Sequence, residues 1–160
     1  MRPHAALATK VVVVALVQLA LVGVAVAPRL SARMTGEEYR LRVAPVDPID
    51  PFRGAYVALD YPDIRSDAEN DADDLGALYV ALVPDGDVWV AGAYLRERPS
   101  EGPYLACDDR DWSTHCGIES LFLPRDEAAA AEESIAGGEV VAVVKVDDRG
   151  NAAVVRLEGA

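Results

Sequence analysis

The sequence predicts a mainly β domain, a β-rich α+β fold built as an antiparallel sandwich or a partly open barrel, preceded by one transmembrane helix. Three observations support this fold class. Most apolar segments are short and separated by turn residues, one segment is rich in alanine and glutamate, and one apolar run has no charged side chain. The first pattern predicts strands, the second predicts a single short helix, and the third predicts a membrane span.

Residues 1–10 form a short tail, and residues 11–27 form the predicted transmembrane anchor. This apolar run, VVVVALVQLALVGVAVA, contains one polar residue, Gln18. Seventeen helical residues rise about 26 Å, slightly less than a hydrocarbon core of about 30 Å, and neighbouring apolar residues can extend the span. A helix at the surface of a soluble core would show a polar face, which this run lacks.

A cleaved signal peptide is the alternative interpretation of this segment. Arg2, His4 and Lys10 would form its basic region, and residues 25–27, AVA, fit a cleavage site. The run is longer than a usual signal core, and Pro28 would follow the cut bond, so we favour an uncleaved anchor. Basic residues flank both ends of the run, so they do not choose its orientation. The short tail, the cysteine pair and the acidic domain favour an extracytoplasmic position for the rest of the chain.

The predicted β domain spans residues 39–160 and follows a juxtamembrane linker at residues 28–38. We expect strands where apolar and polar residues alternate, or where β-branched residues cluster. The predicted strands are residues 39–46, 56–61, 78–83, 88–95, 104–107, 118–123, 140–146 and 152–157. The sequence PDGD at residues 84–87 predicts a hairpin turn, and residues 147–151 predict a second hairpin.

The one helix predicted within this domain lies at residues 124–136, PRDEAAAAEESIA. Alanine and glutamate favour a helix, and acidic side chains in the first turn interact well with the helix dipole. Gly137 and Gly138 then provide a stop signal.

Cys107 and Cys116 are the only cysteines, and they flank the sequence DDRDWSTH. Outside the cytoplasm, a pair at this spacing predicts a disulfide. A zinc site with His115 would need four ligands, and the other histidine, His4, lies before the anchor. Free thiols and a nucleophilic cysteine beside His115 are the remaining alternatives. We therefore predict a disulfide, no metal and no cofactor.

The charge of the chain argues against nucleic acid as a partner. The formal net charge is -12, and residues 28–160 carry -14 because the first 27 residues hold only two charged side chains, both basic. A field of this sign repels nucleic acid and anionic lipid head groups. The acid-rich stretch at residues 60–74 could suggest calcium, but its spacing does not match an EF-hand, and we interpret it as a solvated loop.

The stretch at residues 54–61, GAYVALDY, resembles the motif of the GDYXXLXY protein family. Residues 47–53 and 117–124 and the closing hairpin at residues 140–155 are also similar to that family, so the resemblance spans nearly the whole chain. It implies a single amino-terminal membrane helix. The molecular function of this family is unknown, so the resemblance implies architecture and location only. Ala55 replaces the aspartate of the motif, which weakens the case for an enzyme.

The family-like stretches supply the candidate binding residues. We expect Gly54 to adopt a backbone conformation that other residues avoid. Tyr61 should share a core-facing side of its strand with two apolar neighbours, while its hydroxyl finds a partner. Glu119 either pairs with Arg53 inside the fold or stays solvated, because the strand alternation permits both. The full candidate set is Arg53, Gly54, Tyr56, Leu59, Tyr61 and Glu119.

These observations favour a membrane-anchored extracytoplasmic domain that acts as a binding or accessory module, with another membrane protein as its partner. One alternative is a hydrolase-like enzyme on a signal-peptidase-like β fold, which would use a serine–lysine pair. Lys145 is the only lysine after the anchor, and no serine motif accompanies it. The other alternative is a small-ligand-binding β domain.

Overall fold

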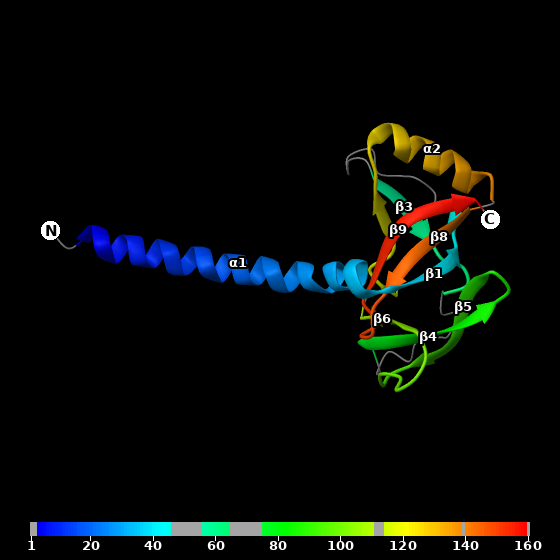
Figure 1. The fold of residues 1–160 in the computed structure, drawn as a ribbon, viewed down its shortest axis with the longest axis horizontal. Helices are drawn as coiled ribbons and strands as arrows, with labels where there is room; N and C mark the ends of the chain where they lie inside the picture. The colour runs from blue at the N-terminus through cyan, green and yellow to red at the C-terminus, as the bar shows by residue number, and fades with distance from the viewer. Residues whose placement is uncertain (1–2, 46–55, 65–74, 111–113, 139, 160) are drawn as a thin grey trace.

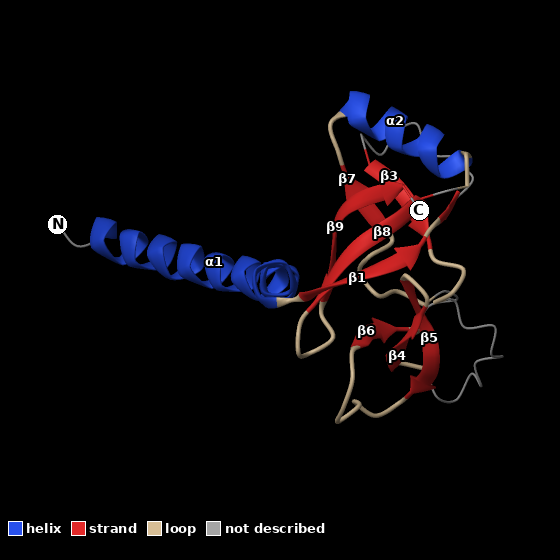
Figure 2. Cartoon of the chain, turned by 45° about the vertical axis from the view of Figure 1, so that its right-hand side comes forward, coloured by secondary structure: helices blue, strands red, loops and turns tan. Residues whose placement is uncertain are grey.

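A long helix projects from a β-rich domain that carries a second, shorter helix (Figures 1 and 2). This computed structural model describes residues 3–45, 56–64, 75–110, 114–138 and 140–159. The elements in chain order are α1 (Pro3–Thr35), β1 (Glu37–Arg42), β2 (Ala44–Pro45), β3 (Tyr56–Asp60), β4 (Ala77–Asp85), β5 (Val88–Leu95), β6 (Tyr104–Asp108), β7 (Ser120–Phe122), α2 (Arg125–Ala136), β8 (Val140–Val146) and β9 (Ala152–Gly159).

The strands form three antiparallel sheets with the orders β1-β8-β9, β2-β3-β7 and β5-β4-β6. In the first sheet, β1 at the start of the domain pairs along its full length with β8 near its end, from Glu37↔Val146 to Arg42↔Val141. Over the described strands, the sheets do not close into a barrel. The predicted mainly β class with one short helix and one long apolar helix is therefore confirmed.

Helix α1 is longer than the predicted anchor at residues 11–27. It continues into the expected linker at residues 28–38 and ends at Thr35. The interpretation of residues 28–38 as a linker relied on their lack of apolar periodicity. In the structure, Ala32 is fully buried against the domain, and the Gly36 N–H donates to its carbonyl oxygen at 2.9 Å. The last helical turn thus docks onto the domain, a tertiary contact that the local sequence pattern does not record.

The segment from Thr9 to Thr35 is long and apolar enough to cross a membrane, with a mean hydropathy of 2.6 in its most apolar window. Its apolar side chains are exposed, with Leu19 at 69% and Val24 at 74%. Such a helix near the amino terminus fits a membrane anchor by length and composition.

The domain core draws on all three sheets. Leu41 of β1, Val80 of β4 and Leu105 of β6 are completely buried, as is Val144 of β8. Helix α2 covers β2 and β3 and buries Ile135 to 3% exposure. Among the residues whose burial the structure describes, every buried apolar residue lies at position 32 or later, so this core belongs to the part of the chain that follows the apolar run.

Candidate functional site

The motif strand β3 directs its apolar side into the core. Val57, Leu59 and Tyr61 are 1%, 4% and 6% exposed, which is the side that the alternation predicts. The Tyr61 hydroxyl donates to the carbonyl oxygen of Ile118 at 3.0 Å. Burial, and then the nearby Glu119 carboxylate, raise the pKa of Tyr61, so it stays a neutral donor. These motif side chains therefore fasten β3 to the turn before β7.

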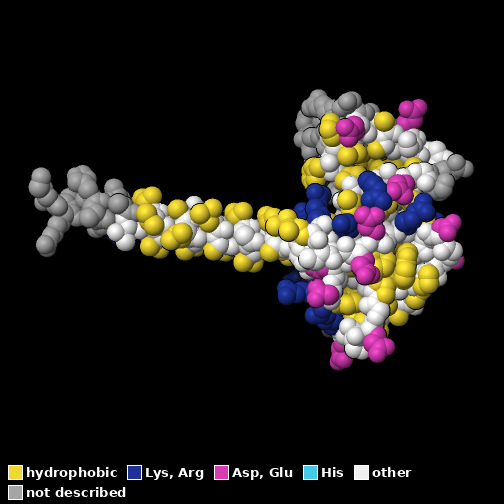
Figure 3. Space-filling model, viewed as in Figure 1, with side chains coloured by type: hydrophobic (Ala, Val, Ile, Leu, Met, Phe, Trp, Pro, Cys, Tyr) yellow, Lys and Arg dark blue, Asp and Glu magenta, His cyan; other side chains and the backbone are white. Residues whose placement is uncertain are grey.

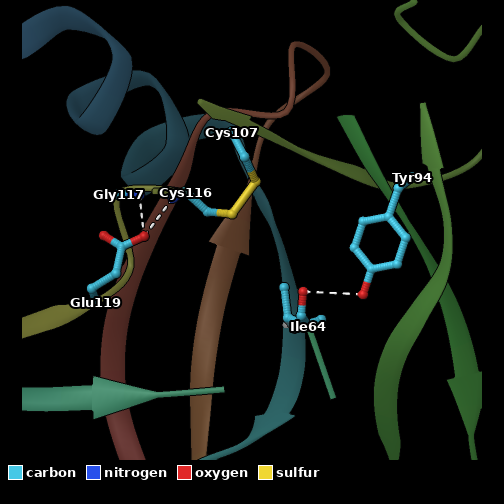
Figure 4. The surroundings of a disulfide bond; sticks show 6 residues. All are labelled: Ile64, Tyr94, Cys107, Cys116, Gly117 and Glu119. Carbon is cyan, nitrogen blue, oxygen red and sulfur yellow. Dashed lines mark hydrogen bonds between the residues drawn. A yellow bond between two sulfur atoms is a disulfide. The ribbon is translucent and has the colours of Figure 1, made fainter. Parts of the chain in front are cut away.

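The carboxylate of Glu119 binds backbone amides of its own turn. Its Oε1 accepts the N–H of Gly117 at 3.0 Å and also the N–H of Cys116 (Figure 4). Gly117 has a φ of +80°, a conformation that favours glycine. Because β7 begins only at Ser120, the strand alternation that gave two alternatives for Glu119 does not extend back to it.

The structure describes only some of the other predicted binding residues. Tyr56 opens β3 in register with Phe122 of β7. Arg53 and Gly54 lie outside the described residues, so the pairing of Arg53 with Glu119 stays a prediction. Leu59 is in the core, and its N–H donates to the carbonyl oxygen of Glu119 at 2.9 Å. The motif thus contributes packing and backbone pairing wherever the structure describes it.

Cys107 and Cys116 form a disulfide that joins the end of β6 to the turn before β7 (Figure 4). Their Cα atoms are 4.1 Å apart, and both residues are buried. Beside the disulfide, Asp108 and His115 exchange two backbone hydrogen bonds of 2.8 Å each. The disulfide therefore ties the β5-β4-β6 sheet to the sheet that contains the motif strand.

Asp147 connects α1 to the β8–β9 turn, a role that the sequence analysis missed. This residue is 6% exposed, and its carboxylate accepts from the Ser31 hydroxyl at 2.6 Å and from the Asn151 side-chain amide at 2.9 Å. The N–H groups of Arg149 and Asn151 donate at 2.9 Å each. Burial raises the pKa of Asp147, but the hydrogen bonds from Asn151, Ser31 and Arg149 outweigh it, so the pKa lies below its usual value.

Lys145 also has a structural contact near this junction. Lys145, which a serine–lysine enzyme would need, donates from Nζ to the carbonyl oxygen of Arg33 at 3.3 Å. A cation at the carboxyl end of a helix interacts favourably with the helix dipole. Among the residues that the structure describes, no three His, Cys, Asp or Glu side chains are grouped so that they could hold a metal ion.

Two pockets flank α1 where it enters the domain, and Arg29 and Gly117 line both. The β7-side pocket has a volume of about 260 Å³, and its other lining residues include Val26, Leu30, Arg33, Leu121 and Phe122. The disulfide-side pocket has a volume of about 380 Å³, and its other lining residues include Ala77, Tyr79, Asp108, His115, Cys116 and Asn151. Figure 3 shows basic side chains gathered where the apolar helix meets the domain.

Phe122 is the most exposed large apolar side chain of the described domain, at 72%. It follows Leu121, which is 6% exposed, so β7 presents one side chain to the core and the next to the surface beside α1. The sequence could not show this, because the alternation of residues 118–123 permits either side to face inward.

The chain matches the family model described as GDYXXLXY protein over residues 18–157. Comparisons with curated proteins and with solved structures found no match. The matched range runs from the middle of α1 to β9, and it includes the motif strand and both cysteines. Because this range covers nearly the whole sequence, the chain belongs to the GDYXXLXY protein family.

Proposed function

We propose that this protein is a membrane-anchored extracytoplasmic module that binds another membrane protein at the disulfide-side pocket. The observation that carries the proposal is that α1 itself forms one wall of this pocket, through Pro28 and Arg29. A partner that fills the pocket must therefore lie directly beside the membrane-spanning segment. The opposite wall offers the polar side chains of His115 and Asn151 together with the ring of Tyr79, a mixture typical of protein interfaces.

The contact between α1 and the domain supports this geometry. Ser31 bonds to Asp147, Lys145 bonds to the last helical turn, and Ala32 is fully buried. With this docking the helix does not act as a flexible tether, so the domain holds one orientation relative to the bilayer. A fixed orientation keeps the pocket at the level of the membrane surface.

The disulfide supports an extracytoplasmic position, because disulfides persist in oxidising compartments. Residues 28–160 carry a net charge of -14. Long domains are exported with little regard to their charge, so the charge is compatible with this orientation.

Site-specific photo-crosslinking in membranes tests the binding proposal. A benzophenone amino acid replaces Ala77, which lines the disulfide-side pocket at the start of β4, or Val83, which is 42% exposed near the other end of the same strand. We expect one discrete protein adduct from position 77 and none from position 83. The adduct should weaken when Tyr79→Ala is combined with the probe at position 77. Equal adducts at both positions, or lipid adducts alone at position 77, would reject the proposal.

A small-ligand site is the second candidate, favoured by a pocket of about 620 Å³ between α2 and β9. Its volume lies within the usual range for ligand pockets, and Leu123, Ala131 and Leu157 supply apolar lining. If this pocket binds apolar molecules, an environment-sensitive dye should bind the native protein, and Ala131→Phe should abolish that binding. Dye binding that is unchanged in Ala131→Phe would reject this candidate.

A further inference from the structure

We infer that the β7-side pocket binds an anionic phospholipid of the surrounding bilayer. Its phosphate would contact Arg29 and Arg33, and an acyl chain would lie along Val26, Leu30 and Phe122. The inference rests on the membrane anchor of the proposed function, but it holds for either orientation of the domain and does not require a protein partner.

One side of α1 provides both parts of this site. Val26, Arg29, Leu30 and Arg33 stand at positions i, i+3, i+4 and i+7, so they lie on one side of the helix, and all four line the pocket. A span of twenty helical residues covers about 30 Å, the thickness of a hydrocarbon core. A span that begins at Val11 therefore ends at Leu30. The two guanidinium groups then lie at the depth of lipid phosphates, which is the level an anionic head group occupies.

The two arginines are available to an anion. Both are exposed, and neither has an ion-pair partner among the residues that the structure describes. The arginines of the strands β1 and β9 differ from them. Arg42 pairs with Asp63 and Asp85, and Arg156 pairs with Glu38 and Glu158. In an acidic domain, exposed arginines without a carboxylate partner at one pocket indicate an anionic ligand, and guanidinium groups suit phosphate geometry.

The opposite wall of the pocket is apolar. Leu121 and Phe122 of β7 line it, and Phe122 is 72% exposed. In Figure 2, β7 lies on the side of the domain from which α1 projects. An exposed phenylalanine at that level meets the boundary between head groups and acyl chains, where aromatic rings are favoured.

The net negative charge of the domain does not oppose a local site. Charges more than about 8–10 Å away are largely screened at physiological ionic strength. Two carboxylates lie closer to α1, because Asp147 bonds to Ser31 and Asp108 lines the disulfide-side pocket with Arg29. Neither of them lines the β7-side pocket, so the phosphate would interact mainly with Arg29 and Arg33. The overall charge argues against broad adhesion to anionic membranes, but it is compatible with one lipid held at one pocket.

Native mass spectrometry of the full chain, released from membranes of mixed phosphatidylglycerol and phosphatidylcholine, tests the inference. The wild type should retain phosphatidylglycerol in preference to phosphatidylcholine. The Arg29→Gln/Arg33→Gln variant should lose this preference, by about fivefold for each arginine removed. The matched control is Arg42→Gln/Arg156→Gln, which removes the same charge from exposed pairs on β1 and β9 and should keep the preference.

Fluorescence quenching by lipids brominated on their acyl chains tests the apolar wall. In a Trp112→Phe background, Trp89 is the only tryptophan. It lies in β5, directly after the β4–β5 hairpin, and this hairpin is on the side of the domain away from α1 in Figure 1. Adding Phe122→Trp should add a quenched, blue-shifted component, while Trp89 alone should remain unquenched.

Flotation of the protein with vesicles tests the membrane anchor separately from the lipid site. A chain that does not float overturns the membrane anchor and this inference together. A chain that floats but shows no lipid preference, or equal losses in both double variants, or no quenching at position 122, overturns this inference alone.

Discussion

The region of the motif strand and the surface beside α1 both carry aromatic and charged side chains, but these side chains have internal partners in the first region and are exposed in the second. Tyr61, next to β3, is 6% exposed and uses its hydroxyl inside the fold, whereas Phe122 on the adjacent β7 is 72% exposed beside the helix. Glu119 satisfies its carboxylate with amides of its own turn, whereas Arg29 and Arg33 have no ion-pair partner among the described residues. The motif strand therefore contributes to the domain core, and the binding surfaces that we propose beside α1 lie at the helix junction.

The comparison predicts a large difference in stability between two aromatic positions. Tyr61→Ala should lower the free energy of unfolding by about 3–5 kcal/mol, because it removes a buried ring and leaves the Ile118 carbonyl oxygen without its hydrogen-bond donor. Phe122→Ala should change it by less than about 0.5 kcal/mol, since the ring is exposed. Urea unfolding of residues 28–160 measures both, and this fragment contains every core residue that the structure describes as buried. Equal losses at the two positions would contradict the comparison.

Reduction of the disulfide should produce the next largest effect. The bond closes a loop with a sequence separation of nine, and chain entropy predicts a loss of about 2.5–3 kcal/mol when it is opened. The paired variant Cys107→Ser/Cys116→Ser should reproduce the loss without a reductant. Alkylation of the unreduced, natively exported protein followed by mass spectrometry should find no modified cysteine. Two modified cysteines would remove both the disulfide and a main support for the extracytoplasmic position.

Asp147 predicts a smaller, pH-dependent effect at the junction. Its pKa in the folded state lies below the unfolded value of about 3.9, so its contribution to stability is present above that pH and is lost as pH falls through the folded pKa. Asp147→Asn should lower the unfolding free energy at pH 7 by about 1–3 kcal/mol, because the asparagine side chain places an N–H donor where an aspartate oxygen accepts hydrogen bonds. The gap from the wild type should narrow below about pH 4. A gap that is constant between pH 7 and 2.5 would exclude this role.

Much of the fold followed from local patterns. Alternation and turn chemistry located most strands, and the PDGD hairpin between β4 and β5 forms as predicted. The sheet orders did not follow, because pairing β1 with β8 joins residues about a hundred positions apart and depends on packing. Helix α1 passes through Pro28 because Ser31 and Ala32 dock onto the domain, which no local signal records.

The candidate site was less predictable than the fold. The motif drew attention to Tyr61 and Glu119, and the structure gives both of them internal contacts. The turn signals at residues 147–151 correctly placed Asp147 in the hairpin turn between β8 and β9. Its bond to Ser31 spans 116 positions and could not be inferred. The β7-side pocket combines residues of α1, β7 and β9, and the disulfide-side pocket combines residues of α1, β4 and β6, so only the assembled structure reveals them.

Carbene footprinting tests the central claim most directly, by comparing residues 28–160 in solution with the full chain in lipid nanodiscs. We predict that labelling of Phe122 falls strongly in nanodiscs, while labelling of Val83, which is 42% exposed near the far end of β4, does not change. Leu59 and Tyr61 should remain unlabelled in both samples, because they are buried in the domain itself. Equal labelling of Phe122 in the two samples, or labelling of the buried motif residues in the folded protein, would contradict the account.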